Sequence, residues 1–501
     1  MELLHNFQLG FAIALTPTNL LFALLGVIVG TLIGALPGIG PVAGVSILLP
    51  LAFGMDPTAA MILMAGIYYG AMYGGTITSV LINVPGESST VMTTLDGYQM
   101  ALYGRAGPAL SIAAIGSFVA GTFSVVLLTI MAVPLARAAL SFGPPEYLML
   151  MLLGLATLSV LLAENKVKGV LSALLGIMIG VIGLDVISAL PRFTFGEIEL
   201  LDGVGFLAVA VGLFGIGEVL ASLERTYKLD PIKTTLRDLI LNKQDLKVST
   251  GPIARGTILG FVVGMLPGAG ATIASFLSYA LEKRISAHPE KFGTGTIEGV
   301  AAPEAANNAS TGGAMVPLLT LGIPGSGTTA VMLGAMMLFG LQPGPLLFEK
   351  NPDFVWGTIA SMYIGNVMLV ILNIVFVPVF VRALMIPYSV LAAFIVLFCI
   401  VGVYSVNFST FELWIMLVSG VIGYVMRKLE FPIAPIVLAL VLGPMMETSL
   451  RQSLLMSQGS FAIFLTRPIS AILAVLVLVF LFAPLLLSFV AKKPLPAAEE
   501  I

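Results

Sequence analysis

Two copies of a short run decide the fold: GTLIGALPGIGPVAG (residues 30–44) and GFVVGMLPGAGATIA (residues 260–274). Aligning them at an offset of 230 positions superposes Pro37 on Pro267, together with four glycines of each copy: Gly30, Gly34, Gly38 and Gly40 on Gly260, Gly264, Gly268 and Gly270. A second pair follows: GGTITSVLINVPGESST (residues 74–90) and GGAMVPLLTLGIPGSGTT (residues 312–329). Aligning Pro85 with Pro324 gives an offset of 239 positions, with one residue of slippage at the Gly-Gly pair. Because the motifs occur in the same order in both halves of the chain while the offset between matching motifs grows slowly, the sequence predicts a duplicated unit with small insertions.

The composition predicts a membrane protein. Of 501 residues, 58% are hydrophobic and only 10% are charged, whereas about a quarter of the residues in a soluble domain are charged. Several apolar runs, such as residues 109–133 and 354–381, exceed the ~20 residues that cross a bilayer as a helix. We therefore expect roughly ten to twelve membrane elements. The net charge of −3 leaves no basic footprint for nucleic acid.

The charges around the second copy predict a re-entrant hairpin. The apolar run between Arg255 and Lys283 has basic residues at both ends and LPGAG in its middle. A straight helix would carry one basic flank to the far side of the membrane, whereas two half-helices of about 16 Å each would reach the midplane and return. Proline and glycine make the break natural, and non-helical backbone at that depth must be buried in protein or line a cavity. The predicted hairpin tips are Pro37, Gly38, Gly40, Pro267, Gly268 and Gly270.

The first copy has no basic flank, since its nearest ionisable neighbours are Glu2, His5 and Asp56. We therefore expect it to enter from the opposite face, although Arg137 and Arg382 do not follow this charge pattern. The predicted fold class is an all-α polytopic membrane protein with two inverted-topology repeats, re-entrant hairpins and broken helices.

The expected segments follow from the repeats and from the basic clusters. They are membrane repeat 1 at 18–220, a cytoplasmic linker at 221–254, membrane repeat 2 at 255–447, and a polar loop, last transmembrane helix and C-terminal tail at 448–501. The basic residues behind the linker and the tail are Arg225, Lys228, Lys233, Arg237, Lys243, Lys247, Lys492 and Lys493.

The second pair of motifs contains the sequences VPGESST (residues 84–90) and IPGSGTT (residues 323–329). In each, a Pro-Gly break inside an apolar run is followed by hydroxyl side chains. A half-helix that begins after such a break presents free amides and the positive end of its dipole, with Ser and Thr oxygens as caps. This arrangement suits an anion, especially a carboxylate, and nearby carbonyls suit Na⁺. The predicted substrate-binding residues are Asn83, Pro85, Gly86, Ser88, Ser89, Thr90, Asn307, Asn308, Pro324, Gly325, Ser326, Thr328 and Thr329.

The alternative for any single stretch is that glycine and proline are simply common in membrane helices, where small residues form packing surfaces. The two matched pairs favour a site, while for Gly30 and Gly34 close helix packing is the preferred interpretation.

The stretch IEGVAAPEAANNASTGG (residues 297–313) carries two carboxylates next to an apolar run. Glu304 and Glu298 are candidates for a coupling proton or cation. A solvated helix start remains the alternative, chiefly for Glu298. Glu87 and Asp96 are weaker candidates for the same role, because the second half has no carboxylate at the aligned positions, Ser326 and Ala335.

An enzyme is not expected. The chain has two histidines, His5 and His288, neither in an HExxH arrangement, and the lysines keep to polar stretches. No metal site or Ser-Lys pair is therefore evident within the membrane, and no cofactor is expected apart from Na⁺ as a candidate coupling ion.

These motifs resemble the large membrane subunit of the tripartite tricarboxylate transporters (TctA-like). The resemblance rests on GTLIGALPGIGP, GGTITSVLINVPGESSTVMTTLDGYQMA, GFVVGMLPGAGATIASFLSYALEKR, FGTGTIEGVAAPEAANNASTGGAMVPLLTLGIPGSGTTAVMLGA and FPIAPIVLALVLGPMME. It implies a secondary transporter of the bacterial inner membrane that imports small di- or tricarboxylates with Na⁺ or H⁺. It also implies two partners, a small membrane subunit and a periplasmic solute-binding protein. A stand-alone carboxylate carrier and a channel or scaffold subunit remain the alternatives.

Overall fold

The protein is almost entirely helical over the residues that the computed structural model describes: 2–161, 165–185, 188–224, 232, 239–268, 270–383, 386 and 388–490. The helices of the first half are α1 (Glu2–Ala14), α2 (Pro17–Ala35), α3 (Gly40–Ala52), α4 (Pro57–Ile82), α5 (Val91–Leu102), α6 (Ala106–Ala139), α7 (Pro144–Leu161), α8 (Lys166–Gly180), α9 (Phe206–Ala210) and α10 (Gly217–Leu223). Those of the second half are α11 (Lys243–Met265), α12 (Gly270–Ile285), α13 (Glu298–Leu321), α14 (Gly327–Leu338), α15 (Leu347–Lys350), α16 (Pro352–Val375), α17 (Val377–Ala383), α18 (Tyr388–Asn407), α19 (Thr410–Lys428), α20 (Ala434–Met456), α21 (Ile463–Thr466) and α22 (Pro468–Val490).

Short elements complete the fold: η1 (Ser88–Thr90), η2 (Ile198–Leu200), the π-helical turn η3 (Val211–Ile216) and η5 (Pro289–Lys291). Strands β1 (Gly183–Leu184) and β2 (Pro191–Arg192) form an antiparallel pair with Gly183 opposite Arg192. Of the basic residues expected to mark the linker and the tail, Arg225, Lys228, Lys233, Arg237, Lys492 and Lys493 lie outside the described residues.

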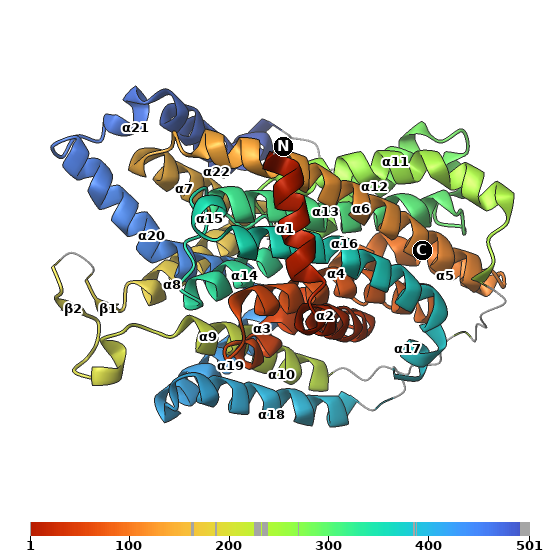
Figure 1. The fold of residues 1–501 in the computed structure, drawn as a ribbon, viewed down its shortest axis with the longest axis horizontal. Coiled ribbons are helices and arrows are strands. Elements are labelled where there is room, and N and C mark those ends of the chain that lie inside the picture. Colours follow the sequence, from red (N-terminus) through yellow and green to blue (C-terminus); the bar gives the residue numbers. More distant parts are fainter. Residues whose placement is uncertain are drawn as a thin grey trace.

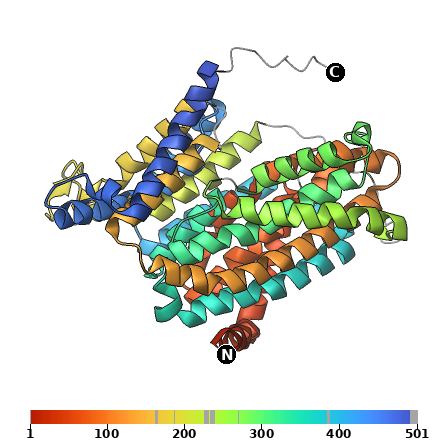
Figure 2. The same ribbon diagram turned by 90° about the horizontal axis from the view of Figure 1, so that it is seen from above.

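The helices form two groups that lie side by side (Figure 2). The first group contains α1, α2, α4, α5, α6, α11, α12, α13 and α16, and the second contains α7, α8, α9, α10, α18, α19, α20 and α22 (Figure 1). Two helices join the groups: α3 contacts α4 on one side and η3 and α18 on the other, and α14 contacts both α4 and α20. The boundary between the groups therefore runs along α3 and α14, and it passes the turn at Gly268, whose backbone lies against Leu158 of α7.

Each Leu-Pro-Gly motif, at residues 36–38 and 266–268, interrupts a helix at the aligned position. α2 ends at Ala35 and α3 begins at Gly40, whereas α11 ends at Met265 and α12 begins at Gly270. The connecting glycines have positive φ angles, a conformation that favours glycine: 95° and 62° at Gly38 and Gly40, 79° and 62° at Gly268 and Gly270. The glycines of each motif thus allow the chain to leave one helix and enter the next. The helices on either side of the second motif have 23 and 16 residues, so both are longer than the half-helices of about 16 Å predicted from the sequence.

Glycines also bring the first helix of each broken pair against its neighbour. A methyl group on Gly34 of α2 would lie 2.0 Å from the carbonyl oxygen of Ala71 in α4, and one on Gly264 of α11 would lie 2.3 Å from that of Ser310 in α13. The backbones therefore touch, as small residues permit in membrane helices. The close packing expected for Gly30 and Gly34 is present.

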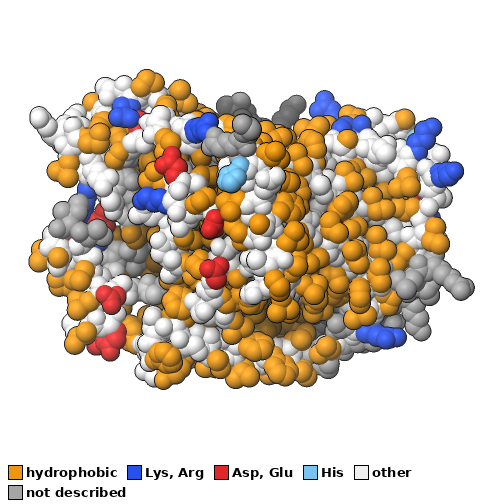
Figure 3. Space-filling model, viewed as in Figure 1, with side chains coloured by type: hydrophobic (Ala, Val, Ile, Leu, Met, Phe, Trp, Pro, Cys, Tyr) orange, Lys and Arg blue, Asp and Glu red, His pale blue; other side chains and the backbone are white. Residues whose placement is uncertain are grey.

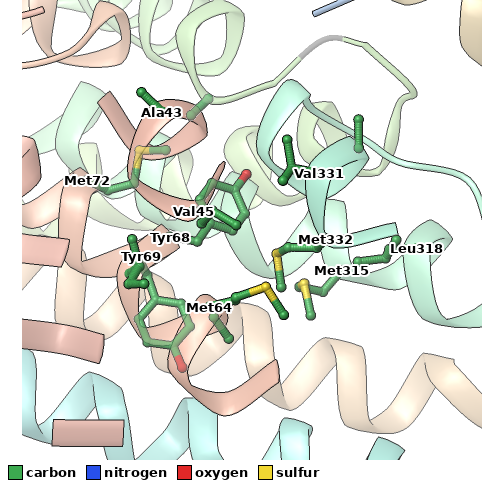
Figure 4. Packing of buried hydrophobic residues seen from close by; sticks show 14 of the residues in the cluster. Ala43, Val45, Met64, Tyr68, Tyr69, Met72, Met315, Leu318, Val331 and Met332 are labelled. Atoms are coloured by element: carbon green, nitrogen blue, oxygen red, sulfur yellow. The ribbon is translucent and has the colours of Figure 1, made fainter. Parts of the chain in front are cut away.

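The buried core joins the two halves of the chain. Met64 and Tyr68 of α4 pack with Met315 of α13 and Met332 of α14, and all four are at most 1% exposed. Figure 4 shows Met64, Met315 and Met332 pointing toward one another. The duplicated segments therefore fold against each other rather than as separate units.

Nine of the described helices are long and apolar enough to cross a membrane. Hydrophobic side chains cover much of the molecular face drawn in Figure 3, and charged side chains on it are few. A protein that exposes this much apolar surface is stable in lipid rather than in water. The chain is a multi-pass membrane protein of the all-α class, as predicted.

Helices run across the segment boundaries expected from the sequence: position 220 lies inside α10, 254 inside α11 and 447 inside α20. Most of the polar stretch at 445–460 continues α20 to Met456. Ion pairs to the β-hairpin explain this continuation, because Arg192 donates to Glu447 (2.8 Å) and Arg451 donates to Asp185 (2.7 Å). The polar end of α20 thus remains helical by packing its charges against the β1–β2 segment.

Candidate functional site

The turns at Gly38 and Gly268, which are the predicted hairpin tips, lie against the two Pro-Gly breaks through equivalent hydrogen bonds. The amide of Gly38 donates to the carbonyl of Gly86 (3.3 Å), and the amide of Gly268 donates to the carbonyl of Gly325 (3.1 Å). Each hydrogen bond holds irregular backbone of one break against irregular backbone of the other. The four breaks in helices thus form two closely packed pairs.

The two Pro-Gly breaks follow the same backbone course. α4 ends with Asn83 in the left-handed conformation (φ 56°), and α13 ends with Gly322 in the same conformation (φ 70°). Glu87 and Ser326, which occupy aligned positions, are both extended and directly precede a new helical turn. The chain therefore leaves one helix and starts the next in the same way at both places.

Thr90 and Thr329 stabilise the turn after each break. Thr90 Oγ1 donates to the carbonyl of Glu87 (2.9 Å), and Thr329 Oγ1 donates to that of Ser326 (3.0 Å). The Ser326 amide also donates to Thr329 Oγ1 (2.8 Å), which completes a capping box at the start of α14. Both threonine side chains are fully buried, so they shape the break.

A cavity of about 500 Å³ lies where the tips and the breaks meet. Its volume falls within the range of small-molecule sites. The predicted residues that line it are Gly38, Gly40, Pro85, Gly86, Ser88, Gly268, Gly270, Ser326 and Thr328. The predicted residues away from its lining are Pro37, Asn83, Ser89, Thr90, Pro267, Asn307, Asn308, Pro324, Gly325 and Thr329.

Hydroxyl groups from both halves of the chain meet at this cavity. Ser88 Oγ lies 2.8 Å from Thr272 Oγ1, and Tyr68 OH lies 3.1 Å from Ser326 Oγ. The first residues of α3, α12 and α14 also line the cavity, so the N-termini of three helices converge on it. Free amides, helix dipoles and hydroxyl donors together favour a negatively charged ligand.

Sequence reasoning missed several residues that line the cavity: Tyr68, Thr272, Glu218 and Arg427. It ranked Glu87 low, and this carboxylate also lines the cavity. The signal that could have found Glu218 is an ionisable residue within the apolar segment that forms α9, η3 and α10, since such residues are rare in membranes and usually functional. Arg427 carries no such signal, because it stands in the last turn of α19, where basic residues are expected.

Asn307 and Asn308 belong to a separate buried polar cluster around Glu304. The Glu304 carboxylate is fully buried and accepts from Thr76 (2.7 Å), Thr93 (2.5 Å) and Asn307 (3.3 Å). Asn308 donates to Ser117 Oγ (2.7 Å). Thr76 and Thr93 belong to the first half and Glu304 to the second, so the cluster links the two halves.

The remaining acidic candidates lie near the start of α13. Glu298 accepts from Thr296 Oγ1 and is partly exposed. Asp96 is fully buried and accepts from the amides of Gly295 (2.8 Å) and Thr296 (2.9 Å) and from the hydroxyl of Tyr279 (2.8 Å). Asp96 therefore ties α5 to the loop before α13. In the part of the chain that the structure describes, no three His, Cys, Asp or Glu residues are grouped to hold a metal ion.

These features define a polytopic helical membrane protein in which broken helices from two halves surround a cavity lined by both apolar and hydroxyl side chains. The family is established by comparison with known proteins: the model of the Tripartite tricarboxylate transporter TctA family matches residues 20–438, so the chain belongs to this family. The family is one of transporters and not of enzymes, and its members are the large subunits of tripartite systems.

Two relatives from Agrobacterium vitis are similar to the chain. The "Uncharacterized 52.8 kDa protein in TAR-I ttuC' 3'region" is 45% identical over 501 residues, which cover the whole of both chains. The "Uncharacterized protein in TAR-II ttuC' 3'region" is 45% identical over 241 residues, which cover 48% of this chain and all of that relative. No solved structure matches the chain.

Proposed function

We propose that the protein is the permease subunit of a binding-protein-dependent secondary transporter that imports small di- or tricarboxylates across the bacterial inner membrane. The observation that carries this proposal is the cavity at which both tips and both Pro-Gly breaks meet. Helix N-termini and hydroxyls provide the donors for a carboxylate in a setting where bare charges are costly.

Helix directions support inverted repeats. α4 and α13 contain aligned segments of the duplication, so inverted repeats require them to run in opposite directions. Met64, near the start of α4, packs with Met315, near the end of α13. Thr76, near the end of α4, donates to Glu304, near the start of α13. The two equivalent helices are therefore antiparallel.

The charges at the helix ends support a re-entrant second hairpin. α11 begins at Lys243 and α12 ends with Lys283 and Arg284 in its last turn. Arg105, before α6, donates to Asp245 of α11 (2.6 Å), so a further basic residue lies at this end of the molecule. By the positive-inside rule this end faces the cytoplasm, and the first hairpin, without basic flanks, opens to the periplasm.

Alternating access then follows from movement of one helix group against the other. The tips and breaks belong to the first group and to α3 and α14 at its boundary, while Phe214, Glu218 and Arg427 complete the cavity from the second group. A bound substrate would touch both groups. Sliding along α3 and α14 would expose the cavity first to one side of the membrane and then to the other.

Coupling to Na⁺ or H⁺ is assigned to Glu304, with Glu298 as the weaker candidate. Glu304 is a buried carboxylate that contacts both halves of the chain, so its occupancy by a cation can bias their arrangement. The solvated position of Glu298 makes it less sensitive to such a movement.

Reconstitution tests the proposal. Proteoliposomes containing this chain, the small membrane subunit and the solute-binding protein should accumulate labelled citrate only when an inward Na⁺ or H⁺ gradient is imposed. Uptake at the same rate without the soluble protein would indicate a stand-alone carrier. Flux without counterflow and without gradient dependence would indicate a channel, and either result would overturn the proposal.

A further inference from the structure

One ion pair lines the cavity from the second helix group. Arg427 of α19 and Glu218 of α10 both belong to the cavity lining, and Arg427 Nη1 lies 2.5 Å from Glu218 Oε2. The arginine side chain is 29% exposed and the glutamate side chain only 4%. Ser222 Oγ donates to the other carboxylate oxygen of Glu218 (2.9 Å). The guanidinium is thus the more accessible member of the pair.

The charges around the cavity make this arginine decisive for an anionic ligand. Glu87 and Glu218 both line the cavity, and Arg427 is the one Lys or Arg side chain among the described lining residues. A tricarboxylate that entered beside two carboxylates without a basic group would meet uncompensated repulsion in a poorly screened environment. Hydroxyls and helix dipoles offset one carboxylate more readily than three.

We infer that Arg427 binds a carboxylate group of the substrate and that Glu218 positions the guanidinium while the cavity is empty. This inference rests on the proposed transport of carboxylates. Arginine suits the role because its planar guanidinium forms two parallel hydrogen bonds to a carboxylate. Between transport cycles, Glu218 neutralises the positive charge of Arg427 within the membrane. During a cycle, the substrate carboxylate competes with Glu218 for the N–H donors of the guanidinium.

The placement of the two binding elements explains a preference for more than one carboxylate. Ser88, Thr272 and Ser326 reach the cavity from the first group and its boundary, whereas Arg427 reaches it from the second. A ligand with two or three carboxylates can contact both elements at once. A monocarboxylate can contact only one, so it gains little from Arg427.

The chain supplies a matched control at the next position. Lys428 pairs with Glu224 (2.9 Å), its side chain is 54% exposed, and it does not line the cavity. Lys428→Gln removes the same charge from the same helix end without touching the site. Any general effect of that charge on membrane orientation therefore appears in both Arg427→Gln and Lys428→Gln.

The test measures competition against labelled citrate uptake in the reconstituted system, using propane-1,2,3-tricarboxylate, succinate and butyrate. Arg427→Gln should weaken inhibition by the tricarboxylate roughly tenfold to a hundredfold, succinate less, and butyrate hardly at all. Arg427→Lys should recover part of the loss, and Lys428→Gln should match the wild type. Glu218→Gln should bind the tricarboxylate as tightly as the wild type or more tightly, since the internal competitor is neutral.

The double variant Glu218→Gln/Arg427→Gln separates binding from folding. It removes both charges of the pair and so avoids the buried carboxylate that Arg427→Gln leaves behind. Its stability should therefore exceed that of Arg427→Gln, while its preference for tricarboxylates over butyrate should remain lost. A double variant with wild-type uptake and preference would show that the pair is only structural and would overturn the inference. Equal effects of Arg427→Gln and Lys428→Gln would also overturn it. Absence of citrate uptake by the wild type would overturn the proposed function itself.

Discussion

The amide of Gly268 and the carbonyl of Gly325 are joined by a 3.1 Å hydrogen bond that connects the turn between α11 and α12 to the Pro-Gly break of the same half. Gly38 and Gly86 form the equivalent hydrogen bond in the first half. In both pairs the donor is the glycine after the proline of a Leu-Pro-Gly motif, and the acceptor is the glycine after the proline of a Pro-Gly break. The turn and the Pro-Gly break of each half are therefore in direct backbone contact beside the cavity.

Gly268→Ala should damage the protein through crowding as well as conformation. The added methyl group would lie 2.4 Å from the backbone nitrogen of Leu158 in α7, at a residue with φ 79°. Gly104→Ala is the control, because Gly104 has a similar φ of 73° but no neighbouring atom within 4 Å of the added carbon. The left-handed conformation alone costs about 1–2 kcal/mol. We expect that cost for Gly104→Ala and a clearly larger loss for Gly268→Ala, measured as the fall in apparent melting temperature in detergent. Equal falls would show that contact with α7 is unimportant.

Two helix glycines should respond to alanine with opposite signs. A methyl group on Gly264 would lie 2.3 Å from the carbonyl oxygen of Ser310, so Gly264→Ala must separate α11 from α13. A methyl group on Gly443 of α20 would meet its nearest atom, of Ile177, at 3.9 Å, which is an ordinary contact. Alanine favours a helix over glycine by about 1 kcal/mol. We expect Gly443→Ala to keep or raise the melting temperature and Gly264→Ala to lower it. A stabilised Gly264→Ala variant would contradict the close approach of the backbones.

Thr329→Val should weaken the second Pro-Gly break. Valine keeps the shape but removes the hydroxyl that bonds the amide and the carbonyl of Ser326. Leaving buried polar groups unpaired costs about 1–3 kcal/mol each. Thermal stability and citrate uptake should both fall in Thr329→Val and largely recover in Thr329→Ser. The aligned pair Thr90→Val and Thr90→Ser should behave alike. If both valine variants retained wild-type uptake and stability, the capping role of these hydroxyls would be excluded.

The breaks could be predicted from the sequence because glycine and proline determine them locally. Gly38, Gly268, Asn83 and Gly322 all have the left-handed backbone that a chain needs to leave a helix. The surrounding charges and side-chain contacts could not be predicted in this way. Arg427 reaches the cavity from a helix far along the chain, and nothing near it in sequence distinguishes it from an ordinary helix-end arginine.

For the binding residues, too, the sequence predicts the position of the break but not which side chains face the cavity. Ser88 and Ser326 line the cavity. Thr90 and Thr329 belong to the same two motifs, but their hydroxyls bond the backbone of the break instead. A repeated motif locates the segment, but the helical register after the break decides which hydroxyl faces the cavity. That register depends on packing between the halves, such as the contact of Tyr68 with Ser326.

Glu304→Gln should disturb the buried cluster between the halves. Thr76, Thr93 and Asn307 all donate to the carboxylate, and a glutamine would turn a donor toward one of them. The mismatch should lower stability by about 1–3 kcal/mol. If Glu304 carries the coupling cation, uptake should also lose its gradient dependence while substrate counterflow persists. Thr93→Ser, which keeps the hydroxyl, is the control. Gradient-driven uptake that survives Glu304→Gln unchanged would exclude Glu304 as the coupling group.

Asp96→Asn should open the loop between α12 and α13. The Asp96 carboxylate accepts from the amides of Gly293, Gly295 and Thr296 and from the Tyr279 hydroxyl, whereas asparagine offers one acceptor oxygen and turns an amide group toward the remaining donors. Tyr279→Phe removes only one of these donors, so it should have the smaller effect. The measurement is tryptic cleavage after Lys291, which lies in this loop. Local opening that is easier by about 1.4–2.8 kcal/mol would speed cleavage roughly tenfold to a hundredfold when opening and closing are fast relative to cleavage. We expect that range for Asp96→Asn and less for Tyr279→Phe. Cleavage at the wild-type rate in Asp96→Asn would show that other contacts hold the loop.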